Sequence, residues 1–301
     1  MNLEVRIGQT KFLNPVTVAS GTFGHAEKYY DLEEVQKLGA IVPKTVTLRA
    51  QEGNPPVRIV ETPSGMLNAI GIENPGADGF IEKKLPGFKK IGVPLIISIL
   101  GHNDEDFKIL AEKFTQAGGF AALELNLSCP NLGHKTLVAQ DPQATHRIVK
   151  LVKSIAKVPV IAKLAPNVTD ITVIAQAAED AGADGLSLIN TFSGMVIDVE
   201  KQKSVLGNFT GGLSGPAIRP LAVNIVYQTA QKVKIPIIAM GGIANADDAL
   251  QFILAGATMV AVGTMNFVNP RAPLEVLNGI KDYMKRHKVN NIHELRGKVK
   301  R

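Results

Sequence analysis

Cysteine is almost absent from this chain, because Cys129 carries the only thiol among its 301 residues. A single cysteine excludes an intramolecular disulfide and a metal site built from several cysteines. Sparse cysteine is also typical of proteins that work in a reducing compartment. We therefore expect a cytoplasmic protein with no metal ion of its own.

Long apolar runs and basic blocks are missing too. No run approaches the roughly 18 residues of a membrane span, and the N-terminal stretch MNLEVRIGQTKFLNP has no apolar segment typical of a signal peptide. The net charge of +6 is spread along the chain, without basic residues interleaved with aromatics, which argues against nucleic-acid binding. A basic surface favours anionic ligands or an acidic partner instead.

Short β-branched runs recur along the chain, and each is followed by a segment with apolar residues at helical spacing. The runs are almost continuously apolar, as expected of parallel strands buried on both faces. Eight β/α units predict a (β/α)8 TIM barrel, formed by a single domain over residues 1–301. A doubly wound open sheet is the alternative. The expected strands are residues 16–20, 40–47, 94–100, 121–128, 158–166, 185–191, 235–242 and 259–264.

Two long insertions interrupt the β/α rhythm, residues 49–92 after the second strand and residues 191–218 after the sixth. Long ordered loops are usually functional, and barrel enzymes build their sites at the C-terminal ends of the strands. The insertions therefore indicate a site on that face. At the other end of the barrel, the stretch LEVRIGQTKFLNP predicts a small hairpin that closes the bottom.

The seventh and eighth strands end in the glycine-bearing turns AMGGI and AVGTMNF. Loops after these two strands form a common phosphate site in barrels. Gly241, Gly242 and Gly263 have no Cβ to keep backbone N–H groups from phosphate oxygens, and Thr264 adds a hydroxyl. The pattern predicts a phosphorylated ligand and suits phosphosugar isomerases and lyases as well as flavin enzymes. Tight turns without a ligand are the alternative.

Polar side chains lie near the ends of several expected strands, where a plain core would have none. Lys163, in VIAKLAP, should be buried, and a buried ammonium needs an anionic partner, either a ligand or a carboxylate inside the barrel. Asn68, in the first insertion, lies beside glycines whose backbone amides could face a ligand, although an Asx turn is an equal alternative. The polar strand-end residues are Ser20, Lys44, Asn126, Lys163 and Asn190.

Cys129 lies in NLSCPN, directly after the fourth expected strand and therefore on the catalytic face. An isolated cysteine is usually a small buried hydrophobe. A thiol at a strand end between Asn126 and Asn131 favours a nucleophile or a general base instead. His134 lies on the same loop, but its spacing does not identify it as a partner of Cys129.

Eight motifs together carry a family resemblance: NLSCPN, MLNAIGIENPG, PKTVT, AKLAPN, INTF, GGLSGPAIRP, AMGGI and VGT. On these motifs the chain resembles the class 1 dihydroorotate dehydrogenases over essentially its full length. The stretch GNPPVRIVETPSGMLNAIGIENPG resembles the NAD-linked class 1B more than the fumarate-using class 1A. Any one motif would be weak evidence, whereas the eight at this spacing are specific.

The resemblance implies a TIM barrel that oxidises (S)-dihydroorotate to orotate with FMN in pyrimidine synthesis. It implies that Cys129 removes a proton from C5 of dihydroorotate, while hydride passes from C6 to flavin N5, and that Lys163 stabilises charge on the reduced flavin. By the same resemblance, FMN would contact Ser20, Lys44, Thr45, Asn126, Lys163, Ile189, Gly215, Gly241, Gly242, Gly263 and Thr264. The substrate would contact Lys44, Asn68, Ala69, Ile70, Gly71, Ile72, Asn126, Asn190 and Thr191.

A second subunit is also implied, because class 1B barrels work with a subunit that carries FAD and a 2Fe–2S cluster, and we expect a heterotetramer of two catalytic and two electron-transfer subunits. This chain has one cysteine and no Gly-x-Gly-x-x-Gly signature, so it cannot itself hold the cluster, or NAD in the usual way. The alternatives are the fumarate-dependent class 1A, a dihydropyrimidine dehydrogenase-like flavoenzyme, and a flavin-free phosphosugar-binding lyase or isomerase.

Overall fold

The computed structural model describes residues 1–24, 32–128 and 138–300. Eight parallel strands form its main sheet, and each of the eight runs expected from the sequence contributes one of them. All eight are buried, as their apolar sequences require. They are β3 (Val16–Val18), β4 (Val46–Thr47), β7 (Ile96–Leu100), β8 (Ala122–Asn126), β9 (Val160–Lys163), β10 (Gly185–Leu188), β15 (Ile237–Met240) and β16 (Met259–Val262).

The sheet closes into a barrel. Its strands follow chain order from β4 through β7, β8, β9, β10, β15 and β16 to β3. The segment before β4 completes the circle, because Gly39 N donates to Val16 O at 2.9 Å and Thr17 Oγ1 donates to Ala40 O at 2.9 Å. The predicted (β/α)8 barrel is therefore confirmed. The doubly wound alternative is wrong, because such a sheet reverses its strand order at a switch point.

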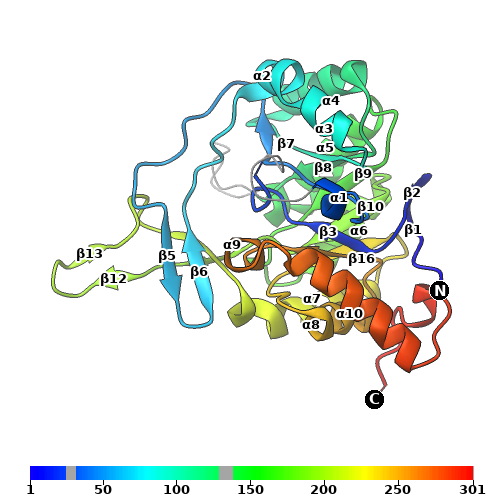
Figure 1. Ribbon diagram of the computed structural model, residues 1–301. Helices are drawn as coiled ribbons and strands as arrows, with labels where there is room; N and C mark the ends of the chain where they lie inside the picture. Colours follow the sequence, from blue (N-terminus) through cyan, green and yellow to red (C-terminus); the bar gives the residue numbers. More distant parts are fainter. Residues whose placement is uncertain (25–31, 129–137, 301) are drawn as a thin grey trace.

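Helices follow the strands and cover the outside of the barrel (Figure 1). Four of them start at an Asn or Asp side chain that accepts backbone N–H groups of the first turn, namely Asn103, Asp141, Asp170 and Asn245. The helices are α1 (Leu32–Val35), α2 (Gly76–Lys83), α3 (Leu85–Ile91), α4 (Asp104–Ala117), α5 (Pro142–Lys153), α6 (Ile171–Asp180), α7 (Arg219–Ala230), α8 (Ala246–Ala255), α9 (Met265–Val268) and α10 (Ala272–Arg286), with the 3-10 turns η1 (Val138–Gln140), η2 (Pro216–Ile218) and η3 (Ile292–Glu294).

The predicted N-terminal hairpin closes the bottom of the barrel. Strands β1 (Val5–Ile7) and β2 (Thr10–Phe12) pair antiparallel. Thr10 Oγ1 donates to the carbonyl of Ala121, just before β8, at 3.1 Å. The turn residue Gly8 lies so close to the N-terminal side of β9 that a Cβ there would be 3.2 Å from Pro159 Cγ.

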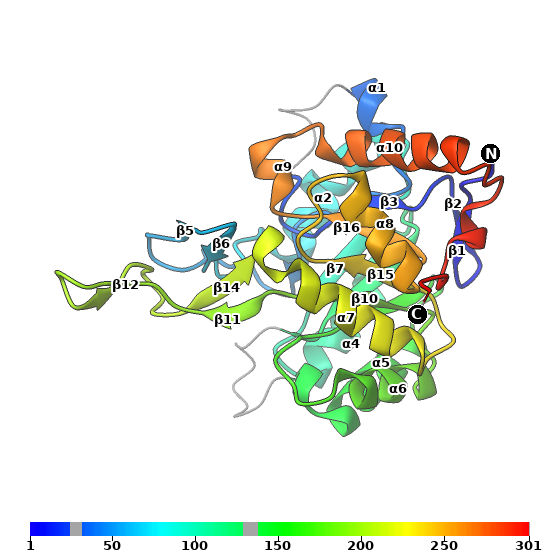
Figure 2. The ribbon, with the colours of Figure 1, turned by 90° about the horizontal axis from the view of Figure 1, so that it is seen from below.

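The two insertions join in one small sheet that projects from the barrel on the side away from the hairpin (Figures 1 and 2). Its order is β11 (Phe192–Gly194), β14 (Gly211–Ser214), β6 (Gly65–Asn68) and β5 (Ile59–Thr62), and β12 (Ile197–Asp198) pairs with β13 (Lys203–Ser204) beyond it. The sequence indicated ordered loops rather than a sheet. Pairing of β6 with β14 joins residues 144 apart, which only the closed barrel brings together.

Candidate active site

Hydroxyl and amide side chains form a hydrogen-bonded row across the C-terminal ends of the barrel strands. Ser20 Oγ, after β3, donates to Pro43 O at 2.8 Å and lies 3.1 Å from Thr45 Oγ1. Thr45 Oγ1 lies 3.0 Å from Ser98 Oγ on β7 and accepts from Asn126 Nδ2 on β8 at 3.4 Å. Thr45, Ser98 and Asn126 are buried, so the row fixes polar groups of neighbouring strands against one another.

The row continues from β8 to the segment after β10. Ser128 Oγ donates to Asn126 Oδ1 at 2.9 Å and accepts from Asn190 Nδ2. Asn190 Oδ1 accepts from the backbone N–H of Thr191 at 2.8 Å. The row thus brings together the predicted residues Ser20, Thr45, Asn126, Asn190 and Thr191.

Two members of this row, Ser98 and Ser128, were missed by the sequence analysis. Ser98 bridges Thr45 to β7, and Ser128 links the two amides. The signal that could have found Ser98 is the one that identified Lys163: a polar residue inside an otherwise apolar run, here PLIISIL.

Lys163 is the last residue of β9, and its side chain is buried. Its Nζ lies 3.8 Å from Oε1 of Glu124, a buried carboxylate on β8. The other oxygen, Glu124 Oε2, accepts from Ser187 Oγ on β10 at 2.7 Å. The anionic partner that the sequence analysis required for Lys163 is therefore present inside the barrel. Glu124 itself was missed, although a carboxylate in the run AALELNLS carries the same signal.

Lys44 lies against the turn that follows β3. A Cβ on Gly21 would lie 3.1 Å from Lys44 Cδ and 3.2 Å from its Nζ. Gly21 also has a φ of 83°, which favours glycine. The absent side chain makes room for the ammonium, and Lys44 adds a cation beside Ser20 and Thr45.

The predicted substrate segment, residues 68–72, begins at the end of β6. Asn68 Nδ2 donates to the carbonyl of Gly212 on β14 at 3.3 Å. A Cβ on Gly212 would lie 2.0 Å from Thr191 Oγ1, so Gly212 is required for Thr191 to approach. Asn68 and Thr191 therefore both lie against Gly212 on β14 of the small sheet. The other members of the segment are Ala69, which is buried, and the half-buried Ile70, Gly71 and Ile72.

Asn74 holds this segment to the barrel. Its Oδ1 accepts from Thr47 N at 3.1 Å and from Gly76 N at 2.9 Å. Its Nδ2 donates to Thr47 Oγ1 and to Ile72 O, both at 2.8 Å. The backbone of Ile72 has a φ of 53°, which is unfavourable for a β-branched residue. Asn74 therefore restrains a strained part of the segment, a role that its motif, IENPG, did not reveal.

The predicted phosphate end lies where β14, β15 and β16 finish. A Cβ on Gly242 would lie 2.8 Å from Gly215 O, and one on Gly241 would lie 2.8 Å from Ala222 Cβ. Thr264 Oγ1, after β16, donates to Ser214 Oγ at 2.8 Å. The backbone turns therefore adjoin. The two further predicted residues here are Ile189, buried behind Gly241, and Gly263, beside Ala19.

Cys129 lies outside the described residues, as do Asn131 and His134. Ser128, which directly precedes Cys129, is held in the row at the end of β8. The role of Cys129 as a base therefore stays a prediction.

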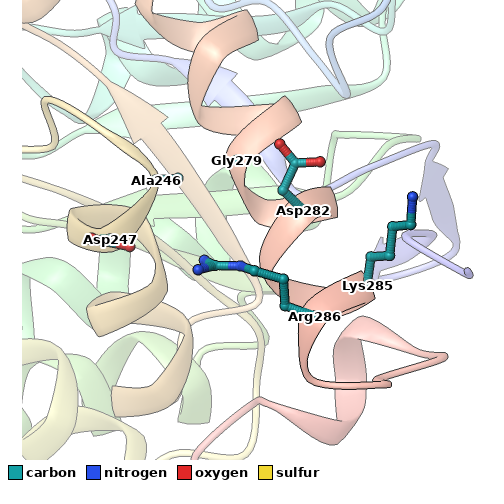
Figure 3. A pocket seen from close by; sticks show the side chains of 6 residues that line it. All are labelled: Ala246, Asp247, Gly279, Asp282, Lys285 and Arg286. Carbon is teal, nitrogen blue, oxygen red and sulfur yellow. The ribbon is translucent and has the colours of Figure 1, made fainter.

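A hollow of about 720 Å³ lies elsewhere, between α8 and α10 on the outside of the barrel (Figure 3). The side chain of Arg286 extends from α10 toward α8, and acidic and basic groups share the lining. It is lined by Ala246, Asp247, Gly279, Asp282, Lys285 and Arg286, none of which belongs to the row at the strand ends.

The described ranges contain neither a cluster of metal-ligating side chains nor a membrane-spanning helix. No group of three or more His, Cys, Asp or Glu residues there is placed to hold a metal ion. None of the helices in that part of the chain has the length and apolar character needed to cross a membrane.

Comparisons with known proteins agree over nearly the whole chain. The family model described as dihydroorotate dehydrogenase matches residues 2–284. A protein of Desulforamulus reducens is 51% identical over 99% of this chain and 98% of its own length. One of Lachnoclostridium phytofermentans is 48% identical over the full length of both chains, and one of Geotalea uraniireducens is 47% identical over 98% of this chain and 97% of its own length. Each of these relatives is named dihydroorotate dehydrogenase B (NAD(+)), catalytic subunit.

Proposed function

The chain belongs to the dihydroorotate dehydrogenase family, and from this premise we propose that it oxidises dihydroorotate to orotate in pyrimidine synthesis, as the catalytic subunit of an NAD-linked enzyme. The observation that carries the proposal is the row of polar side chains with Lys163 at the strand ends. It provides hydrogen-bonding groups and a cation on the face where barrel enzymes react. We further propose that residues 1–301 form one catalytic domain.

Enzymes of this family use a flavin, and we propose FMN. Two observations support the fit. Gly241 and Gly242 have φ values of 128° and 82°, and glycine turns of this kind can present backbone N–H groups to a phosphate. Lys163 Nζ makes no hydrogen bond within residues 1–24, 32–128 and 138–300, so its donors are available to a ligand. FMN, when bound, supplies the acceptor for the hydride that leaves C6 of dihydroorotate.

The proposed FMN contacts divide between the two parts of the site. The glycine turns would hold the phosphate and the polar row would hold the ring, where Lys163 would stabilise the charge that the ring gains on reduction. The residues proposed to contact FMN are Ser20, Lys44, Thr45, Asn126, Lys163, Ile189, Gly215, Gly241, Gly242, Gly263 and Thr264.

Dihydroorotate carries a carboxylate and an amide-rich ring, and the row offers partners for both. The Lys44 ammonium suits the carboxylate through a charge-assisted hydrogen bond. The amides of Asn68, Asn126 and Asn190 can donate to and accept from the ring. The residues proposed to contact the substrate are Lys44, Asn68, Ala69, Ile70, Gly71, Ile72, Asn126, Asn190 and Thr191.

Cys129 is the proposed base. Its Sγ takes the proton from C5 of dihydroorotate, and the electron pair of the broken C–H bond forms the new C5–C6 double bond as the hydride departs from C6. General-base assistance of this kind contributes about 10²–10⁴ in rate. Asn126 and Ser128 support the proposal, because they are hydrogen-bonded to each other directly before this residue in the chain.

A catalytic subunit requires a partner, and we propose a subunit that carries FAD and a 2Fe–2S cluster, in a heterotetramer of two catalytic and two electron-transfer subunits. The single cysteine of this chain supports a separate partner, because an iron–sulfur cluster usually needs four thiolates. The fumarate-dependent and dihydropyrimidine dehydrogenase-like alternatives are not favoured, since the relatives named above are NAD-linked dihydroorotate dehydrogenases.

The test is a comparison of electron acceptors. The chain is produced together with a class 1B electron-transfer subunit and assayed with dihydroorotate and either NAD or fumarate. We expect NAD reduction matched by orotate formation. Rapid turnover with fumarate and none with NAD would contradict the NAD-linked function, and a purified chain without flavin would contradict the flavin chemistry itself.

A further inference from the structure

We propose that Glu124 is a positioning residue for the reaction, which holds the Lys163 ammonium in the place where it meets the flavin. This inference rests on the proposed function, because it takes Lys163 to be a flavin contact. It concerns a buried carboxylate that the sequence analysis did not identify and that the proposed chemistry does not otherwise use.

The geometry places the carboxylate beneath the lysine. Lys163 pairs in register with Asn126 on β8 and with Ser187 on β10. Glu124 lies two residues before Asn126 on the same strand, and therefore one layer deeper in the barrel. Its carboxylate spans the interior, with Oε2 accepting from Ser187 Oγ at 2.7 Å and Oε1 lying 3.8 Å from Lys163 Nζ. Ser187 thus fixes Glu124, and Glu124 faces the ammonium.

Neither charge has another ion-pair partner in the part of the chain that the structure describes. Glu124 Oε1 is buried and accepts no hydrogen bond there, and Lys163 Nζ has no second carboxylate within ion-pair distance. Side-chain exposure is only 2% for Glu124 and 7% for Lys163. An isolated buried ammonium is costly. Without the Glu124 charge, the Lys163 ammonium has no anionic neighbour among the described residues to hold it in place.

Unlike a surface ion pair, this buried pair fixes the position of the Lys163 ammonium. Glu124 anchors the ammonium from below, at a distance too long for a hydrogen bond, while the donors of Nζ stay free for a ligand above. A carboxylate that acted only through its own charge would disfavour the reduced, more negative flavin. One that acts by holding Lys163 in place favours it. Removing the charge of Glu124 should therefore raise the flavin midpoint potential if the carboxylate acts only through its own charge. It should lower the potential if the carboxylate acts by holding Lys163 in place.

The experiment is a double-mutant cycle read in the midpoint potential of bound FMN, with Glu124→Gln, Lys163→Met and the double variant. We expect both single changes to lower the potential and the double variant to fall no further than Lys163→Met. FMN dissociation should follow the same pattern, with each single change weakening binding roughly tenfold, as for contacting charged groups. The matched control is Glu112→Gln, an exposed residue on α4, which should leave the potential unchanged.

An unchanged or raised potential in Glu124→Gln contradicts the proposal, and so do single effects that add in the double variant. If Glu124→Gln does not fold, Ser187→Ala provides the test, because it keeps the carboxylate but removes the hydroxyl that fixes it. We expect a smaller shift in the same direction, and no shift in Ser187→Ala counts against the proposal.

The wild-type chain separates this inference from the proposed function. If wild type binds FMN and dihydroorotate reduces it, while the Glu124 and Ser187 variants keep the wild-type potential, only the positioning role fails. If wild type binds no FMN, the proposed function fails and the positioning role fails with it.

Discussion

Replacing Asn74 by Ala tests whether the substrate segment is held to the barrel as described. The change removes four side-chain hydrogen bonds, two accepted by Oδ1 and two donated by Nδ2. It also leaves the backbone N–H groups of Thr47 and Gly76 without that acceptor in a region where Asn74 is 7% exposed. A lost hydrogen bond costs about 0.5–1.5 kcal/mol and an unsatisfied buried group about 1–3 kcal/mol. Partial relaxation and water entry bring the expected loss in the free energy of unfolding to roughly 2–5 kcal/mol.

The same change should weaken catalysis through the substrate rather than the cofactor. Asn74 holds the carbonyl of Ile72, whose backbone has a φ of 53°. Freed from this bond, Ile72 can relax toward an ordinary conformation and move the segment away from the substrate. Misplacement by about 1 Å can cost about 100-fold in rate. We expect kcat/KM for dihydroorotate to fall roughly 10- to 100-fold, while the FMN content stays that of wild type.

The assays are chemical unfolding followed by circular dichroism, and steady-state kinetics with the FMN content measured on the same samples. Asn74→Asp keeps an acceptor for Thr47 and Gly76 but loses both donated bonds, so it should fall between wild type and Asn74→Ala. Asn290→Ala, at an exposed position, is the control and should match wild type. The reasoning is refuted if Asn74→Ala shows the stability and kcat/KM of the Asn290→Ala control.

Three further outcomes are expected. Cys129→Ser should keep FMN and bind orotate, while flavin reduction by dihydroorotate in stopped flow slows about 10²–10⁴-fold; an unslowed rate removes Cys129 from the mechanism. Gly241→Ala should lose FMN and reduce the free energy of unfolding by about 1–3 kcal/mol, because its Cβ would lie 2.8 Å from Ala222 Cβ. Gly263→Ala is the control: its nearest contact is at 3.5 Å, so without flavin it should have the same free energy of unfolding as flavin-free wild type. The lone chain should reduce its own FMN with dihydroorotate but reduce NAD slowly or not at all, and rapid NAD reduction by that chain would rule out the two-subunit account.

The barrel could be predicted from the sequence because each strand is a short, nearly continuous apolar run, a pattern that local composition alone determines. The small projecting sheet could not. Two of its strands, β6 and β14, pair although their residues are 144 apart in sequence. Strand β14, which reads GGLS, also has no apolar alternation to mark it as a strand. Pairing of this kind depends on the closed barrel, which carries the two insertions on the same face.

The site was predictable to the extent that single residues stood out. Lys163 was found because an ammonium in an apolar strand requires a partner, but its partner, Glu124, could be named only once the register of β8 and β9 was known. Ser98 was missed because a single hydroxyl in an apolar strand does not require a ligand as its partner. A neighbouring strand can supply its hydrogen bond, as Thr45 does here. The role of Asn74 depends on four contacts that its neighbours in sequence do not reveal.

The most direct test of the central claim is a single anaerobic turnover of the purified chain. The bound flavin is quantified from its absorbance, dihydroorotate is added in excess, and the loss of oxidised flavin is followed while the orotate formed is measured. The account predicts complete bleaching with one orotate formed for each flavin reduced. Flavin that stays oxidised while dihydroorotate is present, or orotate formed without flavin reduction, would contradict it.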